Sequence, residues 1–163
     1  MKKSLLILLT AGLVMSLVPA HPHMRKSVTA KVGDSEVTLQ YFTAPINMDH
    51  IGKVGVGDFR RGANLNIGGD LKAGATTIAA GDYTVGCIRN GEKTWTMVLS
   101  PGKLGRGESP DKSQLINLDS HFSTDMGSVE HVTFDISPGS DSLSGRAAVV
   151  WRFGNHYLAG AIS

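Results

Sequence analysis

Residues 58–100 read DFRRGANLNIGGDLKAGATTIAAGDYTVGCIRNGEKTWTMVLS. Turn-forming groups (GGD, KAG, AAGD and RNGEK) recur at short intervals between runs rich in Thr, Val, Ile, Tyr and Trp. This rhythm is typical of consecutive antiparallel strands. The stretch therefore predicts an all-β protein, and nothing in it has the pattern of a catalytic site.

The clearest predicted hairpin joins residues 83–89 to residues 94–100. Asn90 and Gly91 lie between the two strands, and both tolerate the positive φ angles that a tight reversal needs. Side chains two positions apart share one face of a strand, so the apolar residues here predict a core. The predicted core consists of Val85, Trp95, Met97, Leu99, Phe134, Val149 and Trp151.

Three short motifs in this stretch also follow one another in a recognisable order. They read F-R-R-G-A-N at 59–64, A-G-D-Y-T-V at 80–85 and W-T-M-V-L at 95–99. They resemble the domain-of-unknown-function family 2911 of secreted bacterial proteins, whose members typically read W-R-x-G-A-N, L-P-A-G-x-Y and W-T-x-x-x. The resemblance extends from about residue 27 to the C-terminus.

The chain departs from the family pattern at three places. Phe59 stands where the family usually has Trp, Ile78-Ala79 where Leu-Pro is usual, and His131 where an aromatic residue is common. The resemblance implies a fold and an exported location. It implies no activity, because the family has none established.

Further strands are indicated by alternating apolar and polar residues outside the central stretch. They are expected at 27–32 and 36–42, joined by a hairpin turn at Gly33-Asp34-Ser35, and at 114–118, 131–136, 146–153 and 156–162. Within the central stretch, short strands are also expected at 64–71 and 76–78. Gly154-Asn155 fits a final two-residue turn, and residues 43–57 read as a long connection that could cross between two sheets. With about nine strands and no convincing amphipathic helix, the chain favours an antiparallel, jelly-roll-like β-sandwich. Only residues 121–129 are ambiguous.

Residues 1–20 have the pattern of a secretory signal peptide. Lys2 and Lys3 form a positive segment, an apolar run follows, and Val18-Pro19-Ala20 resembles a cleavage site. The apolar run is shorter than the roughly 20 residues needed to span a bilayer. We therefore expect a periplasmic or extracellular protein that begins at His21 and has no transmembrane segment after cleavage.

The net charge and the cysteine content argue against a nucleic-acid-binding protein and exclude an intrachain disulfide. The chain has sixteen Lys and Arg against fourteen Asp and Glu, and the difference equals the two lysines of the leader. Residues 21–163 are thus formally neutral, without the basic patch that nucleic-acid binding requires, and their length predicts one domain. Cys87 is the only cysteine, so no intrachain disulfide is possible, and we interpret it as a small buried apolar group rather than a nucleophile.

Arg60 and Asn64 are the predicted ligand-binding residues, with Arg61 beside them. A guanidinium group and a carboxamide on a rigid scaffold can hold a carboxylate, a phosphate or a sugar. The structural alternative is that Arg60 caps loop carbonyls and that Gly62 supplies backbone freedom. The sequence leaves both roles open, and the structural one is favoured for Arg60.

The candidate metal site is the N-terminus that cleavage after Ala20 would create. The free amine and ring of His21, together with His23, could chelate copper, but Pro22 lacks the amide N–H that a tight square-planar site uses. No metal or cofactor is therefore predicted. The remaining histidines have no metal-ligand spacing, and the flanking of His121 by Asp119 and Asp125 does not indicate a triad.

These observations favour a secreted, non-catalytic binding or accessory module for an unknown ligand. The alternative is a secreted enzyme, a hydrolase or a copper-dependent one, with a site spread over strand-end loops. Fold alone does not separate them, because β-sandwiches host both. The sequence does not indicate partner proteins or an oligomeric state.

Overall fold

The computed structural model describes residues 24–163. The predicted leader, residues 1–20, and the possible copper ligands His21 and His23 lie outside the described residues.

The described chain is all-β, with twelve antiparallel strands, one short α-helix, α1 (Met48–Gly52), and two single-turn 3-10 helices, Lys112–Gln114 and Asp141–Leu143. The strands are β1 (Arg25–Val32), β2 (Ser35–Phe42), β3 (Phe59–Ile67), β4 (Leu71–Ala73), β5 (Thr76–Ile78), β6 (Gly81–Gly91), β7 (Thr94–Pro101), β8 (Ile116–Asn117), β9 (Asp119–Ser123), β10 (Val129–Pro138), β11 (Ala147–Gly154) and β12 (His156–Ile162).

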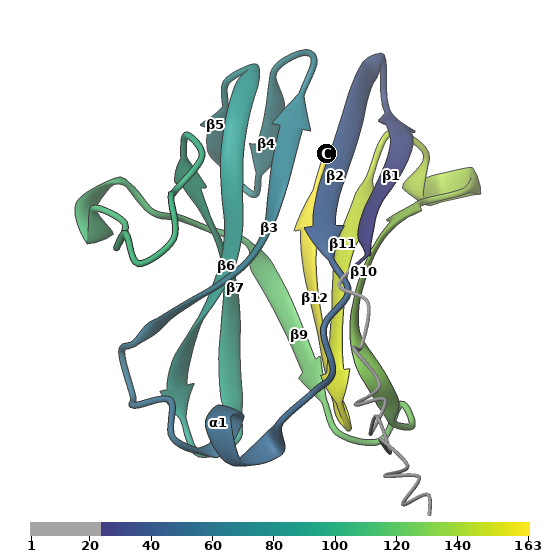
Figure 1. Ribbon diagram of the computed structural model, residues 1–163. Coiled ribbons are helices and arrows are strands. Elements are labelled where there is room, and N and C mark those ends of the chain that lie inside the picture. The colour runs from purple at the N-terminus through teal and green to yellow at the C-terminus, as the bar shows by residue number, and fades with distance from the viewer. Residues whose placement is uncertain (1–23) are drawn as a thin grey trace, which may run out of the picture.

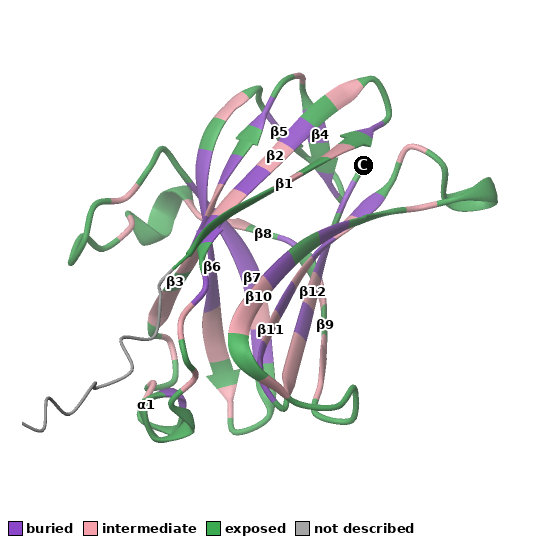
Figure 2. Ribbon diagram, turned by 45° about the vertical axis from the view of Figure 1, so that its right-hand side comes forward, coloured by how far each residue is buried: buried purple, intermediate pink, exposed green. Residues whose placement is uncertain are grey.

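The strands form a six-stranded sheet in the order β1-β2-β3-β6-β7-β8 and a four-stranded sheet in the order β10-β11-β12-β9. A two-stranded sheet, β4-β5, lies near one end. The two larger sheets face each other (Figure 1), and their inner side chains belong to one hydrophobic cluster. The inner side chains form this cluster because of the alternation that Figure 2 shows along β2, where buried residues alternate with less buried ones. Period-two patterning thus gives each sheet one apolar face.

Both edges of the facing sheets are linked by hydrogen bonds. After β2, the amide of Ile46 donates to Glu130 O at 3.1 Å, and the amide of Val132 donates to Ala44 O at 2.9 Å, so this segment pairs with β10. At the other edge the chain passes directly from β8 to β9. There the amide of Leu118, between these strands, donates to Met97 O of β7 at 2.9 Å, and the amide of Met97 donates to Ser120 Oγ of β9 at 2.9 Å. The long connection over residues 43–57 therefore does contact the second sheet before it returns to β3.

Every residue of the predicted core is buried, from Val85 to Trp151. The hairpins at Gly33-Asp34 and Gly154-Asn155 also form where the sequence places them. Gly33 and Gly154 have φ angles of 59° and 63°, which the two tight turns require.

Three details differ from the expectations. The expected strand at 64–71 divides into β3 and β4 at Gly68-Gly69. The ambiguous stretch, residues 121–129, includes the end of β9. The strands therefore number twelve rather than about nine. The β6–β7 turn falls at Glu92-Lys93, because Asn90 is an inserted residue in β6 whose side chain donates to Thr96 Oγ1 at 2.6 Å. The connection before β3 also contains α1, which is capped by Asn47.

Candidate functional site

The outer face of the six-stranded sheet carries two rows of polar side chains. Each row crosses three neighbouring strands, β2, β3 and β6, at residues that are direct cross-strand partners. One row is Thr38, Asn66 and Asp82, and the other is Gln40, Asn64 and Thr84. We call these six residues the polar rows. They result from the same alternation that sends Leu39, Leu65 and Val85 into the core.

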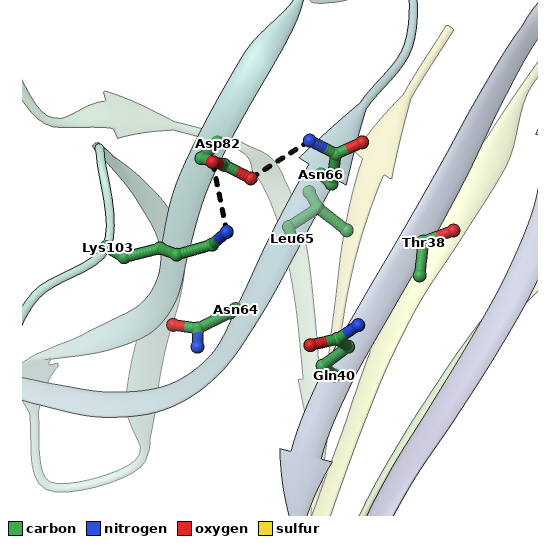
Figure 3. Close-up of a pocket in the computed structure, with 7 residues that line it drawn as sticks. All are labelled: Thr38, Gln40, Asn64, Leu65, Asn66, Asp82 and Lys103. Carbon is green, nitrogen blue, oxygen red and sulfur yellow. Dashed lines mark hydrogen bonds and ion pairs between the residues drawn. The ribbon is translucent and has the colours of Figure 1, made fainter.

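Part of this face forms a shallow cavity of about 250 Å³. Figure 3 shows its lining, with Lys103 approaching from the loop after β7. Asn66 Nδ2 donates to Asp82 Oδ1 at 2.9 Å, and Lys103 Nζ lies 3.0 Å from Asp82 Oδ2. The hydrogen bond from Asn66 and the contact with Lys103 lower the pKa of Asp82. The carboxylate is thus held ionised, with each oxygen already in contact with a donor.

Asn64 and Gln40 lie at the end of this cavity away from Asn66 (Figure 3). Asn64 is half-buried, and its Oδ1 is a buried oxygen without a hydrogen-bond partner among residues 24–163. Buried polar atoms are normally satisfied by protein or by ordered water. Because the side chain of Asn64 also lines the cavity, a donor that enters the cavity can satisfy this acceptor once the carboxamide turns toward it.

A second cavity, of about 530 Å³, adjoins the first and shares Gln40 and Asn64 with it. Three arginines, Arg25, Arg61 and Arg106, line this cavity, and no acidic residue does. Arg25 Nη2 donates to Gln40 Oε1. We call this space the arginine cavity. Its charge suits an anion or a group with a strong negative dipole.

The structure does not bring Arg60 and Asn64 into one cavity. Arg60 pairs with the buried Cys87, whereas Asn64 pairs with Thr84. One residue is inserted in β3 between Arg61 and Ala63, so the strand register shifts there. As a result Arg61, not Arg60, lines the arginine cavity with Asn64. Arg60 lines only a neighbouring hollow, which it shares with Arg61, Asp58 and Glu108.

The carbonyl-capping role considered for Arg60 belongs to Arg89 in the structure. Arg89 Nη1 donates to Val54 O at 2.7 Å and to Gly52 O at 3.3 Å, and its Nε donates to Gly91 O at 3.0 Å. Among the described residues Arg60 has no side-chain hydrogen bond to a loop carbonyl, and it lies on β3 rather than in a turn.

Gly62 has a steric role rather than the expected conformational one. Its φ is not positive, but a Cβ at this position would lie 2.4 Å from Phe134 and 3.1 Å from Trp151. These two rings stack on each other with their centroids 4.8 Å apart. The glycine of the F-R-R-G-A-N motif therefore makes room for an aromatic pair from the opposite sheet.

The remaining candidates from the sequence are dispersed. Asp119 and His121 are exposed on β9, and Asp125 follows that strand in a loop. Cys87 is buried as expected, and burial raises the pKa of its thiol. Within residues 24–163, no three His, Cys, Asp or Glu side chains lie close enough to hold a metal ion, and no helix there is long and apolar enough to span a membrane.

The sequence reasoning missed seven polar or charged residues of the two cavities, namely Arg25, Thr38, Gln40, Asn66, Asp82, Lys103 and Arg106. Gln40 could have been found, because it alternates with Leu39 and Tyr41 in a predicted strand beside β3. Lys103 and Arg106 could not have been found, because they lie in a polar loop whose sequence has no periodic pattern of apolar residues.

Comparison of the chain with family models, with curated proteins and with solved structures finds no match.

Proposed function

We propose that this protein is an exported, non-catalytic binding or accessory module, and that its ligand binds on the outer face of the six-stranded sheet at the polar rows. We further propose that its two facing sheets are a jelly-roll-like β-sandwich akin to that implied for the domain-of-unknown-function family 2911. The motif residues support this relation, because F-R-R-G-A-N and A-G-D-Y-T-V lie on the adjacent strands β3 and β6.

The observation that carries the proposal is the alignment of polar residues, three of them from the motifs, across those strands. Asn64 and Thr84 are direct partners on the outer face, as are Asn66 and Asp82. Thr84 is engaged by the loop after β7, since its Oγ1 donates to Gly102 O at 3.0 Å and accepts from Leu104 N at 2.9 Å. Asn64 lies beside it, and its buried acceptor oxygen has no hydrogen-bond partner within residues 24–163. The sheet provides a rigid base, and the amides provide directional hydrogen bonds.

Binding to this face can be tested with the protein that begins at His21. Backbone amide NMR signals would be followed during titration with a panel of neutral and acidic oligosaccharides. We expect the shifted signals to cluster on β2, β3 and β6, and Asn64→Ala and Gln40→Ala each to weaken binding by about tenfold through loss of a hydrogen bond.

Ser137→Ala provides the matched control, because Ser137 is an exposed polar residue on the four-stranded sheet. It should bind as the unaltered protein does. If every compound of the panel left the signals of β2, β3 and β6 unchanged, the outer face would not be a saccharide-binding surface and this proposal would fail.

A further inference from the structure

We propose that the ligand of this face is an acidic saccharide, whose carboxylate binds in the arginine cavity and whose hydroxyl groups bind to Gln40 and Asn64. This inference rests on the proposed binding function and adds the chemical class of the ligand.

The negative charge of the ligand follows from the guanidinium groups. Arg61 and Arg106 have neither an ion-pair partner nor a side-chain hydrogen bond within the part of the chain that the structure describes, and Arg25 contacts only the neutral amide of Gln40. Three like charges around one cavity repel one another unless an anion compensates them. A guanidinium group binds a carboxylate through two parallel hydrogen bonds, which makes arginine well suited to this ligand group.

The loop that carries Arg106 is fixed to the sheet, so the cavity is already formed. Gly102 N donates to Asp82 O at 2.8 Å, Leu104 N donates to Thr84 Oγ1, and Lys103 pairs with Asp82. The nearest acidic residue in this loop, Glu108, accepts a hydrogen bond from Gly105 N. Glu108 and Asp58 line the neighbouring hollow with Arg61, but neither lines the arginine cavity or forms an ion pair with its arginines among the described residues, so the cavity itself contains no carboxylate.

The inference that the ligand is a sugar follows from the carboxamide of Asn64. Asn64 lies at the junction of the two cavities, and its Oδ1 has no partner among the described residues. A simple anion without a hydroxyl group, such as sulfate, offers only acceptors and cannot satisfy this oxygen. A hydroxyl group can both donate to this oxygen and accept from a neighbouring amide. Neighbouring hydroxyl groups on a sugar ring match the pair of amides at Gln40 and Asn64, and the carboxylate of the same ligand would lie toward the arginines.

The aromatic side chain in the arginine cavity also agrees with a saccharide ligand. Phe42 lines the arginine cavity and is 62% exposed, an unusual state for a large aromatic side chain. Its ring can cover the C–H face of a sugar while the polar groups bind the edges. The adjoining cavities extend across β2, β3 and β6 and reach β1 at Arg25, a span suited to an oligosaccharide rather than to one ring.

The test uses calorimetric titration of the protein that begins at His21. The ligands are oligosaccharides of polygalacturonate and of alginate, each paired with its carboxyl-reduced, neutral form. We expect at least one acidic form to bind at least tenfold more tightly than its neutral pair, and this preference to shrink as salt is raised.

Charge-removing variants connect that preference to the cavity. Arg61→Gln and Arg106→Gln should each weaken the acidic oligosaccharide by about tenfold and leave the neutral form unchanged. Lys31→Gln, which removes an exposed charge from the same sheet outside the cavity, should change affinity less than twofold. Circular dichroism of each variant would establish that it folds.

Other results would overturn the inference in distinguishable ways. Equal binding of acidic and neutral forms on β2, β3 and β6 would refute the acidic class and leave the binding function intact. Inorganic sulfate, which has no hydroxyl group, would refute the sugar component if it bound as tightly as the oligosaccharide. Failure of all the oligosaccharides to bind this face would refute both the ligand class and the proposed function.

Discussion

Arg89 is the residue that fixes the long connection to the six-stranded sheet. Its guanidinium group donates to the carbonyls of Gly52 and Val54, next to α1, and to Gly91 on its own strand. It also lies 5.9 Å from the centroid of Trp95. A single side chain therefore satisfies three backbone acceptors and adds a cation–π contact.

We expect Arg89→Ala to lower the free energy of unfolding by about 1 to 2 kcal/mol, because these partly exposed acceptors lose their donor and Trp95 loses its cation. Chemical denaturation measures the change. Arg60→Ala is the matched control, and its effect should stay within about 0.5 kcal/mol, as for other surface substitutions without such contacts. A larger loss for Arg60→Ala than for Arg89→Ala would contradict this assignment.

The candidate site shows how far single residues could be predicted from the sequence. Asn64 was identified from a motif, and it does line a cavity. The choice between Arg60 and Arg61 depended on the register of β3, and an inserted residue between Arg61 and Ala63 reverses the simple alternation. A bulge depends on packing across two sheets, so residue types along one strand do not reveal it.

Strand β3 shows at the scale of an element why its motif contains glycine. The bulge brings Gly62 against the stacked rings of Phe134 and Trp151, which belong to β10 and β11. A methyl group there would have to displace backbone or rings, and overpacking of a core costs about 1 to 3 kcal/mol. Gly62→Ala should therefore lower the free energy of unfolding by that amount in a denaturant titration.

Gly52→Ala provides the comparison for this prediction. Gly52 ends α1, its φ is not positive, and a Cβ there would meet no atom within 4 Å. The alanine should leave stability unchanged or raise it slightly, because it restricts the unfolded chain. If the two variants unfolded at the same denaturant concentration, the close approach at Gly62 would have no energetic importance.

The elements themselves were largely predictable, for a physical reason. Long strands with one buried face have a period of two, and tight turns need residues with positive φ, so β1–β2 and β11–β12 were located with their turns. Short strands lack enough residues for a period. The expected strand at 114–118 is therefore reduced to the two residues of β8, and β9 was not identified as a strand. The Asn90-Gly91 pair predicted the right hairpin but lies two residues from the actual turn, because Asn90 is bulged and bonds to Thr96.

At the scale of the whole molecule, the two sheets meet through a cluster of rings at one end. Trp95 comes from the six-stranded sheet, and Phe122, Phe153 and His156 come from the four-stranded sheet. The ring of His156 stacks on Phe153 with centroids 5.1 Å apart and lies edge-on to Trp95 at 6.3 Å. An ionisable ring is thus part of the contact between the sheets.

Protonation of His156 should consequently weaken the contact between the sheets. Burial lowers the pKa of His156, and the nearby Arg89 charge acts in the same direction, partly opposed by a hydrogen bond with the Phe153 backbone. Since the pKa is lower in the folded state than in the unfolded state, the unfolded chain binds the proton more readily. The contribution of His156 to stability is complete above the ordinary histidine pKa of about 6.5 and is lost as the pH falls below it.

His156→Phe tests this because phenylalanine keeps a ring in the cluster but cannot bind a proton. Denaturation curves of both proteins between pH 8 and pH 5 would give the difference in unfolding free energy at each pH. We expect the variant to gain stability relative to the unaltered protein as the pH falls below about 6.5. A pH-independent difference would show that His156 has the same proton affinity folded and unfolded, and that the ring cluster tolerates a charge. Asp82 does not confuse the result, because its lowered pKa places its titration below this range in both proteins.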